Sequence, residues 1–540
     1  MKLKNILYSM MMGTAVLTGT TSCVSDLDQY PHTETTSKDV YTSLANYEAV
    51  LGKIYAAMVT SGQGKGGDNK DMESVLNNGS GFDYMRMFIN MQECGTDEFA
   101  STWLTGAQNT GLTYLSWDAN DAWVSDMYYR IYYNIALCNE FLRNANSASF
   151  SGADAEKMKE YKAEVRFMRA LFYYHALDFY RNIPMVTEND PVGSFIPPRY
   201  TPQQTFDYIE SELKDCVGDM LPASTCPYGQ ASQGAAYTLL AKLYLNSEVY
   251  TGVAKYAECK EACEKVMGMG YSLESDYSKL FNADNDKRTN EIIFALPVSA
   301  EHTVSWGSST YLVCGQVSMS NANQNVADYG VTAGWSEFRL RPEFVDKFSQ
   351  TDIDGIGDKR CKFFTNGQSK DVTSMADEAT GYLSEKWSNL KDDKTTASNT
   401  ADAGVETDFP LFRLADVYLM YAECVVRTGG DWDNWAGGSD ATDPTVIASR
   451  KQGAIYWINQ LRERSNASDV WASNFANDDE FLQFILDERA RELYHEGYRR
   501  TDLIRYGQFT TNKYIWQWKG GTHDGQAVDS KYNIYPIPNT

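Results

Sequence analysis

Residues 487–507 read DERARELYHEGYRRTDLIRYG, a stretch that sets charged residues among apolar ones at helical spacing. Glu488 and Glu492 lie one helical turn apart. Two neighbouring carboxylates could indicate a glycoside hydrolase, because these enzymes need two carboxylates beside the glycosidic bond that they cleave. The interleaved Arg residues favour a structural ion-pair network instead, because bidentate bonds from Arg remove the proton-donor capacity that catalysis needs. We therefore predict a structural role for this helix and no enzymatic activity for the chain.

Helical periodicity also dominates much of the chain that precedes this stretch. Predicted single helices cover residues 42–60, 122–142, 154–179, 201–220 and 478–495, and two predicted helical hairpins cover 232–250 with 256–268 and 409–427 with 449–464. The hairpins carry small and aromatic residues in a pattern similar to tetratricopeptide repeats. We predict an all-α fold, a tetratricopeptide-like helical hairpin scaffold over about residues 39–61, 121–275 and 409–508, with long irregular loop insertions.

Two long regions do not follow the helical pattern. Residues 62–120 and 276–408 are rich in Gly, Asn, Asp, Thr and Trp. Irregular segments of this length within a compact protein are usually functional. We therefore expect one body over residues 23–540, in which a rigid helical scaffold holds two irregular ligand-binding regions.

The N-terminus has the layout of a secretory signal. Lys2 and Lys4 precede a mostly apolar stretch at residues 6–17, which is shorter than the roughly 20 residues of a membrane span. Small residues then lead to Cys23. This order predicts a lipoprotein signal peptide at residues 1–22 and lipidation of Cys23, which would anchor the protein on a membrane through acyl chains. Ordinary cleavage, or an incidental Cys, is the alternative.

Composition excludes several classes of function. The chain has 540 residues and a net charge of -24, which argues against a nucleic-acid partner because phosphate binding needs basic patches. Of the ten Cys, nine follow Cys23, so complete disulfide pairing is impossible. The sequence contains no CxxC or HExxH motif, and we predict no zinc site and no cofactor.

A weak calcium candidate lies at residues 352–358, which read DIDGIGD. Asp352, Asp354 and Asp358 match positions one, three and seven of an EF-hand loop. Phe363 stands at position twelve, where a Glu is expected. A polar turn is therefore favoured over a structural calcium site.

Four ordered motifs resemble the SusD/RagB family of outer-membrane nutrient-binding lipoproteins, and with the lipoprotein start the resemblance spans nearly the whole chain. They are residues 163–170 (AEVRFMRA) followed by 180–184 (YRNIP), residues 413–423 (RLADVYLMYAE), residues 488–505, and residues 535–538 (YPIP). The resemblance implies a helical tetratricopeptide scaffold with an irregular face that binds glycans. It also implies a partner, a SusC-like TonB-dependent outer-membrane transporter.

The function that the resemblance implies is capture of oligosaccharides at the cell surface by a lipid-anchored outer-membrane protein, which delivers them to this transporter. A peptide-binding uptake lipoprotein of the RagB type is the alternative. A glycan hydrolase is the second alternative.

Aromatic residues in the irregular regions are the candidate glycan-binding residues. The chain has 36 Tyr, 23 Phe and 12 Trp, and Trp and Tyr rings suit the apolar faces of sugar rings. Neighbouring Asp and Asn side chains would bind the hydroxyl groups. The candidates are Trp103, Asp97 and Asn109 in the first region and Trp306, Tyr311 and Trp335 in the second. Trp335 follows Gly334 just before a predicted helix, which favours packing over ligand contact.

Overall fold

The computed structural model describes residues 37–62, 71–72, 76, 82–105, 109–193, 195–399, 404–434 and 443–539. The chain divides into two compact units, Met1–Ala49 and Val50–Thr540, and the scaffold and the candidate site belong to the second. The predicted signal peptide and the predicted lipidation site Cys23 lie outside the described residues. Among the residues that are described, none of the helices combines the length and the apolar character needed to cross a bilayer.

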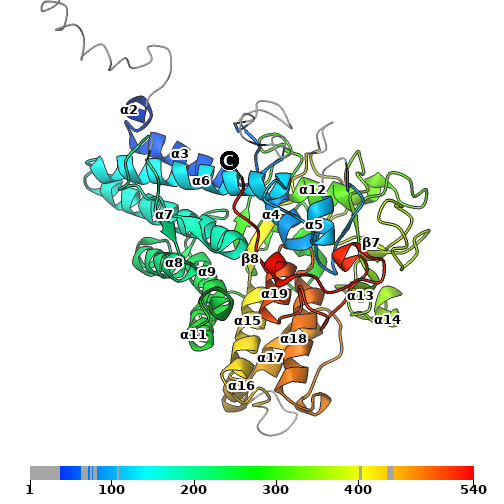
Figure 1. The fold of residues 1–540 in the computed structure, drawn as a ribbon. Helices are drawn as coiled ribbons and strands as arrows, with labels where there is room; N and C mark the ends of the chain where they lie inside the picture. The colour runs from blue at the N-terminus through cyan, green and yellow to red at the C-terminus, as the bar shows by residue number, and fades with distance from the viewer. Residues whose placement is uncertain are drawn as a thin grey trace, which may run out of the picture. The chain divides into compact units, whose positions relative to one another are not determined.

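Helices make up most of the regular backbone in the described ranges. The α-helices are α2 (Ser37–Val40), α3 (Leu44–Ala56), α4 (Tyr84–Glu93), α5 (Thr110–Tyr114), α6 (Ala122–Ser147), α7 (Ala153–Tyr180), α8 (Pro202–Cys216), α9 (Gln233–Leu245), α10 (Ser247–Thr251), α11 (Tyr256–Met267), α12 (Ser308–Gly315), α13 (Pro342–Val345), α14 (Gln350–Ile353), α15 (Leu414–Arg427), α16 (Pro444–Arg450), α17 (Ala454–Arg464), α18 (Asp478–Leu493) and α19 (Arg499–Arg505) (Figure 1). Short 3-10 helices are η2 (Val217–Asp219), η3 (Tyr277–Phe281), η4 (Asn285–Lys287), η5 (Val326–Tyr329), η6 (Ala472–Asn474), η7 (Lys519–Gly521) and η8 (Ser530–Asn533).

The strands pair only in twos within the described residues, and every pair is antiparallel. The pairs are β1 (Ala100–Ser101) with β5 (Phe338–Arg339), β2 (Ile183–Pro184) with β3 (Arg199–Tyr200), β4 (Ile292–Leu296) with β8 (Phe409–Arg413), and β6 (Phe363–Phe364) with β7 (Leu383–Ser384). The β1–β5 pair joins the two regions that the sequence predicts to be irregular.

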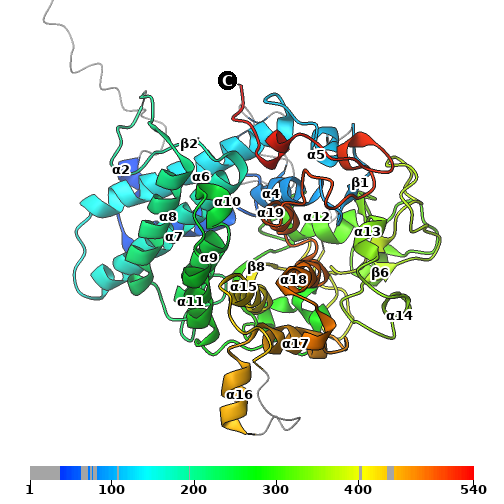
Figure 2. The same ribbon diagram turned by 60° about the horizontal axis from the view of Figure 1, so that its bottom comes forward.

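The helices pack on one another as successive neighbours. Helix α6 lies along α7, α7 along α8, and α9 along α11 (Figure 1). Helix α11 then packs on α15, which also contacts α17 and α18 (Figure 2). The predicted all-α scaffold is confirmed.

Local sequence signals explain where several helices begin. Thr201 and Gln204 form a capping box at the start of α8, in which Thr201 Oγ1 accepts a hydrogen bond from the Gln204 N–H over 3.3 Å. Pro202 occupies the first helical position, where its missing N–H costs no hydrogen bond. The predicted start of this helix is therefore confirmed.

The structure corrects two predicted boundaries. Residues 409–413 form strand β8 and do not belong to the helix that follows, which begins at Leu414. Pro410 accounts for this difference, since Pro lacks an N–H and disfavours helix in the residue before it. The region 62–120, predicted to be irregular, contains helix α4, whose N-cap Asp83 accepts a hydrogen bond from the Arg86 N–H over 2.9 Å.

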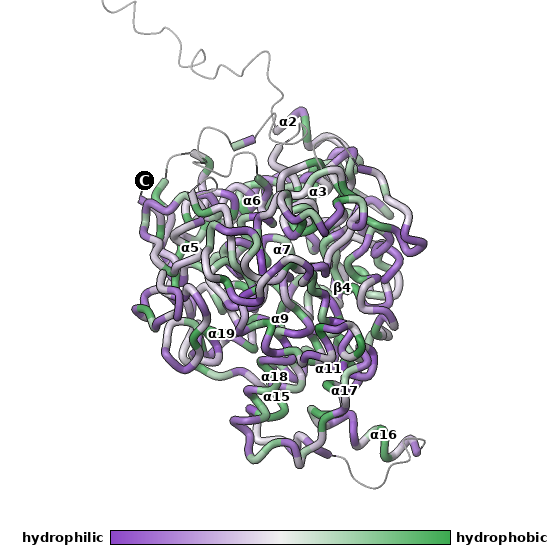
Figure 3. Tube along the Cα trace, turned by 90° about the vertical axis from the view of Figure 1, so that its right-hand side faces the viewer, coloured by the Kyte–Doolittle hydropathy of each residue, from purple (hydrophilic) through white to green (hydrophobic). Residues whose placement is uncertain are grey.

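Charged residues fill much of the interior around α15 and α18. Both helices carry hydrophilic as well as hydrophobic residues along their trace (Figure 3). Arg360 Nη1 lies 2.7 Å from Glu488 Oε1 and 3.2 Å from Glu492 Oε2, and all three side chains are fully buried. Burial alone raises the pKa of Glu492, but Arg464 and Arg413 outweigh burial and hold that pKa well below its usual range. These carboxyls are locked ion-pair partners, as the sequence predicts.

Candidate functional site

Three partly exposed tryptophans on three separate segments are linked to one another through Arg86 and through a backbone carbonyl. Trp103 follows β1, Trp306 precedes α12, and Trp335 precedes β5. Trp103 is 37% exposed and Trp306 is 43% exposed, while Trp335 is half-buried. The indole Nε1–H of Trp103 donates to the backbone carbonyl of Trp335 over 3.1 Å. We call Trp103, Trp306 and Trp335 the tryptophan platform.

Arg86 of α4 connects the segments beneath the platform. Its Nη1 donates to the backbone carbonyl of Trp306 over 2.6 Å. The guanidinium carbon lies 4.1 Å from the ring centroid of Phe82, 4.2 Å from that of Tyr311 and 5.9 Å from that of Trp335. Aromatic faces attract a guanidinium through their quadrupole, more strongly where water is excluded. Arg86 is 1% exposed, so these contacts hold a charged centre in the interior.

Glu337 neutralises this buried charge. Its Oε2 lies 3.1 Å from Arg86 Nη2, and its Oε1 accepts a hydrogen bond from Asn109 Nδ2 over 3.2 Å. Asn109 Nδ2 also donates to Ser101 Oγ over 3.2 Å. Burial raises the pKa of Glu337, and Arg86 and Asn109 oppose that rise. The resulting network links α4 to the segments that carry Asn109 and Glu337.

Asp83 fixes the segment that carries Trp306. Its carboxylate accepts hydrogen bonds from Ser305 Oγ over 2.6 Å and from the Ser308 N–H over 3.1 Å, in addition to capping α4. Gly307 lies so close that a Cβ built there would stand 2.1 Å from Asp83 Oδ1. Only glycine leaves room for this approach. The Trp306 segment is therefore clamped onto the start of α4.

Three of the predicted ligand residues lie in the interior, which corrects the expectation that they contact a ligand directly. Tyr311, Asn109 and Asp97 are each 0% exposed. The Tyr311 hydroxyl donates to Asn90 Oδ1 over 2.7 Å, below the platform. All three residues lie in the regions predicted to be irregular, but tertiary packing buries their side chains.

Asp97 also belongs to a different cluster. Its two oxygens accept hydrogen bonds from Arg499 Nε over 2.7 Å and Nη2 over 2.8 Å, and Tyr514 donates a further one over 2.7 Å. Burial raises the pKa of Asp97, but Arg499 outweighs burial and lowers that pKa to about 2. Asp97 therefore ties the first irregular region to α19 and does not join the platform.

A polar rim borders Trp335. Glu378 Oε2 accepts hydrogen bonds from Ser336 Oγ and from Ser320 Oγ, each over 2.7 Å. The Met319 N–H donates to Ser336 Oγ over 2.6 Å, and the Met319 side chain is 71% exposed. This rim places hydroxyl and carboxylate groups next to an aromatic surface. Glu378, Arg86 and Glu337 could not be predicted from the sequence, because their partners are remote in the chain.

The calcium candidates are engaged by protein donors. Asp352 Oδ2 completes a capping box with Ser349 at α14, and its Oδ1 accepts from the Asp358 N–H over 2.7 Å. Asp354 accepts from Gln350 Nε2 over 2.8 Å, and Asp358 pairs with Arg360 over 2.6 Å. The described part of the chain holds no cluster of three or more His, Cys, Asp or Glu arranged for a metal ion. Asp352 and Asp354 therefore accept hydrogen bonds from within their own turn.

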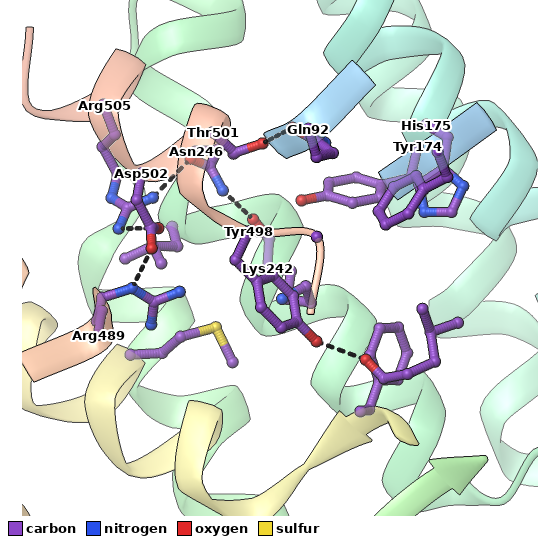
Figure 4. A pocket seen from close by; sticks show the side chains of 16 residues that line it. Gln92, Tyr174, His175, Lys242, Asn246, Arg489, Tyr498, Thr501, Asp502 and Arg505 are labelled. Carbon is purple, nitrogen blue, oxygen red and sulfur yellow. Dashed lines mark hydrogen bonds and ion pairs between the residues drawn. The ribbon is translucent and has the colours of Figure 1, made fainter. Parts of the chain in front are cut away.

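A separate small pocket lies in the scaffold between α9, α15 and α19 (Figure 4). Lys242, Tyr174, Tyr498 and Asp502 are among its lining residues, and Asp502 Oδ2 lies 2.7 Å from Arg489 Nε. Its volume of about 30 Å³ suits roughly one water molecule. This pocket is too small to hold an organic ligand, so the tryptophan platform is the stronger candidate site.

The sequence of this chain is similar to those of known protein families and of a characterised protein. A family described as "SusD family" matches residues 359–540, and one described as "Starch-binding associating with outer membrane" matches residues 27–245. The starch-binding protein SusD of Bacteroides thetaiotaomicron is 33% identical, over 100% of this chain and 97% of that protein.

Solved structures show the same fold at lower identity. A SusD-like carbohydrate-binding protein from Bacteroides fragilis has a TM-score of 0.69 at 18% identity, covering 92% of this chain and 98% of that chain. Surface glycan-binding protein A from Bacteroides thetaiotaomicron, in complex with laminarihexaose, has a TM-score of 0.66 at 16% identity, covering 92% and 96%. At these identities the likeness establishes the fold alone.

Proposed function

Because this chain belongs to the SusD family, we propose that it captures oligosaccharides on the tryptophan platform at the outer-membrane surface. The observation that carries the proposal is the meeting of Trp103, Trp306 and Trp335 beside a polar rim. A sugar ring offers apolar C–H faces and a rim of hydroxyl groups. Aromatic rings bind the faces, and Ser or Glu side chains bind the hydroxyls.

The proposed ligand class is an α-linked glucan of the starch type. The support is the 33% identity over the whole chain with a protein whose name states that it binds starch. The laminarihexaose complex comes from a protein only 16% identical, so it gives β-linked glucans weaker support. Maltooligosaccharides are therefore the first ligands to test.

Membrane attachment and delivery form the second part of the proposal. Lipidated Cys23 would hold the protein on the outer membrane, and a SusC-like TonB-dependent transporter would receive the sugar. The family description of residues 27–245 mentions association with the outer membrane, which supports attachment. Labelling with a radioactive fatty acid, compared with a Cys23→Ala variant, tests the anchor. Co-purification of a barrel transporter from outer membranes tests the partner.

We propose binding without catalysis. The carboxylates that resemble a catalytic pair, Glu488 and Glu492, are fully buried and held by Arg360, so they meet no substrate. Incubation of the pure protein with starch should release no reducing ends. Release of reducing ends would establish the hydrolase alternative.

Calorimetric titration tests the proposed function directly. The ligands are maltoheptaose, laminarihexaose and a mixture of peptides, and the expected result is saturable heat with maltoheptaose. Trp306→Ala should abolish most of this heat. Trp471→Ala is a matched control, since Trp471 is also 43% exposed but lies before η6, far along the chain from the platform segments. Heat with peptides alone would replace this proposal with the peptide-binding alternative.

A further inference from the structure

We infer that Glu337 is the positioning residue of the tryptophan platform, a carboxylate sealed from solvent whose two oxygens tie together the three segments that carry the rings. The inference rests on the proposed function, because it explains how the binding surface is held in shape. Glu337 is 0% exposed, so a bound sugar does not contact it. Its effect on binding must pass through the groups that it holds.

The first oxygen reaches Trp306 through Arg86. Glu337 Oε2 lies 3.1 Å from Arg86 Nη2, and Arg86 Nη1 donates to the Trp306 carbonyl over 2.6 Å. The two nitrogens belong to one planar guanidinium, so the position of the carboxylate sets the direction of the second bond. Without Glu337, Arg86 would be a buried cation with no counter-charge and would move toward water.

The second oxygen reaches the Trp103 segment through Asn109. Glu337 Oε1 accepts from Asn109 Nδ2 over 3.2 Å, and the Thr102 N–H donates to the Glu337 carbonyl over 2.8 Å. These two bonds hold the chain on both sides of Trp103. Glu337 itself follows Trp335 by two residues, which completes the set of three segments.

A negative charge in this network is required because Arg86 and Asn109 both donate to the Glu337 side chain, which also hydrogen-bonds Tyr311. A carboxylate presents an acceptor to Arg86 and another to Asn109, whereas a glutamine amide presents one acceptor and one donor. Glu337→Gln therefore removes the charge pair and sets an N–H against one of the two donors. A buried polar group left without its partner costs more than the bond itself contributes. The three segments that carry the tryptophans should then shift relative to one another, although no tryptophan has been replaced.

Fluorine NMR of the full chain labelled with fluorotryptophan tests this role. In ligand-free Glu337→Gln, the resonances of Trp103, Trp306 and Trp335 should shift or broaden, and affinity for maltoheptaose should fall about tenfold. Glu423→Gln is the matched control, since Glu423 is also 0% exposed and paired with arginines but lies on α15. It should lower the melting temperature and leave the three resonances and the affinity unchanged. Unchanged platform resonances in Glu337→Gln would overturn the inference.

A charge-swapped double variant covers the case in which Glu337→Gln does not fold. Combining Glu337→Gln with Asn109→Asp moves the carboxylate to position 109, so that one negative charge stays in the network, while the amide oxygen at position 337 faces Arg86 and the amide N–H faces the new carboxylate. The inference expects this double variant to recover folding and the wild-type platform resonances. Failure to recover either would count against it. A wild-type protein that binds no maltoheptaose would contradict the proposed function alone, because the ligand-free spectra still decide the role of Glu337.

Discussion

The indole N–H of Trp103 donates to the backbone carbonyl of Trp335, with 3.1 Å between nitrogen and oxygen. The two residues are 232 positions apart in the chain and belong to different irregular regions. Because this bond occupies the polar edge of the indole, the proposed ligand would contact Trp103 through its ring. Trp103 therefore both offers contact area and holds the neighbouring segment.

Trp103→Ala should weaken maltoheptaose binding by roughly 1–2 kcal/mol, as expected for an aromatic contact residue. The melting temperature should change little, because the side chain is 37% exposed. Trp103→Phe keeps a ring but loses the N–H, so it should retain part of the affinity. Calorimetric titration and thermal melting measure the two effects. An equal loss of stability and affinity would instead assign Trp103 to the core.

Gly307→Ala should displace the Trp306 segment. A Cβ at this position would lie 2.1 Å from Asp83 Oδ1, and Asp83 already caps α4 and holds Ser305. We expect a loss of stability of roughly 1–3 kcal/mol, as for an overpacked site, together with weaker sugar binding. Gly218→Ala is the control, since a Cβ there meets nothing within 4 Å. Urea unfolding and titration of both variants give the comparison, and equal behaviour would contradict the clamp.

Arg413→Met should be strongly destabilising. The Arg413 guanidinium pairs with Glu492 over 2.6 Å, with Glu496 over 2.7 Å and with Glu291 over 3.1 Å, and every one of these side chains is fully buried. Its removal leaves three carboxylates short of a counter-charge, which should cost about 3–5 kcal/mol of unfolding free energy.

An exposed arginine provides the control for Arg413→Met. Arg143 pairs with Glu140 over 2.8 Å, with both side chains about a third exposed. Arg143→Met should cost less than about 1 kcal/mol, since solvent screens surface ion pairs. Denaturant titration measures both variants. A small loss in Arg413→Met would show that the buried network is dispensable for stability.

Glu164 makes folding stability depend on pH. It is 2% exposed, accepts a hydrogen bond from the Tyr55 hydroxyl over 2.6 Å, and burial raises its pKa to about 7. The folded state therefore binds a proton more tightly than the unfolded state, so the stabilisation is complete below about pH 4.5 and is lost as pH rises through 7. In Glu164→Gln, the decrease in the free energy of unfolding with rising pH should be smaller by on the order of 2–3 kcal/mol.

Urea unfolding at about pH 5 and about pH 8 measures this effect. Asp408, whose pKa burial also raises to about 7, adds to the decline in the wild type. The difference between wild type and Glu164→Gln is therefore the relevant quantity. Parallel pH profiles for the two proteins would show that Glu164 is ionised in the folded state at neutral pH.

The sequence predicted the elements whose causes are local. Periodic apolar residues and the Thr201 cap located the long helices to within a few residues. Strand β8 was missed although Pro410 is a local signal against helix, because the partner strand β4 that pairs with residues 409–413 lies far away in the chain. Helix α4 was missed in a region predicted to be irregular, although its Asp83 cap is a local signal.

The platform was predictable only in part. Trp103, Trp306 and Trp335 stood out as aromatic residues in irregular regions, and the structure brings them together, although their binding of sugar stays a prediction. Glu337 and Arg86 gave no such signal, because their pairing spans 251 positions. Burial of Tyr311 and Asn109 likewise depends on tertiary packing. Sequence patterns identified the rings, whereas the fold alone reveals what holds them.

The buried charges also decide whether the molecule can be made smaller. Arg413 ends β8 directly before α15, yet its counter-ions Glu492 and Glu496 come from 79 and 83 positions further along the chain. A fragment trimmed before α18 would lose Glu488, Glu492 and Glu496, and it would leave two buried cations with fewer acidic partners, Glu291 for Arg413 and Asp358 for Arg360. A shortened version of this protein will therefore have to keep the residues from α18 onward.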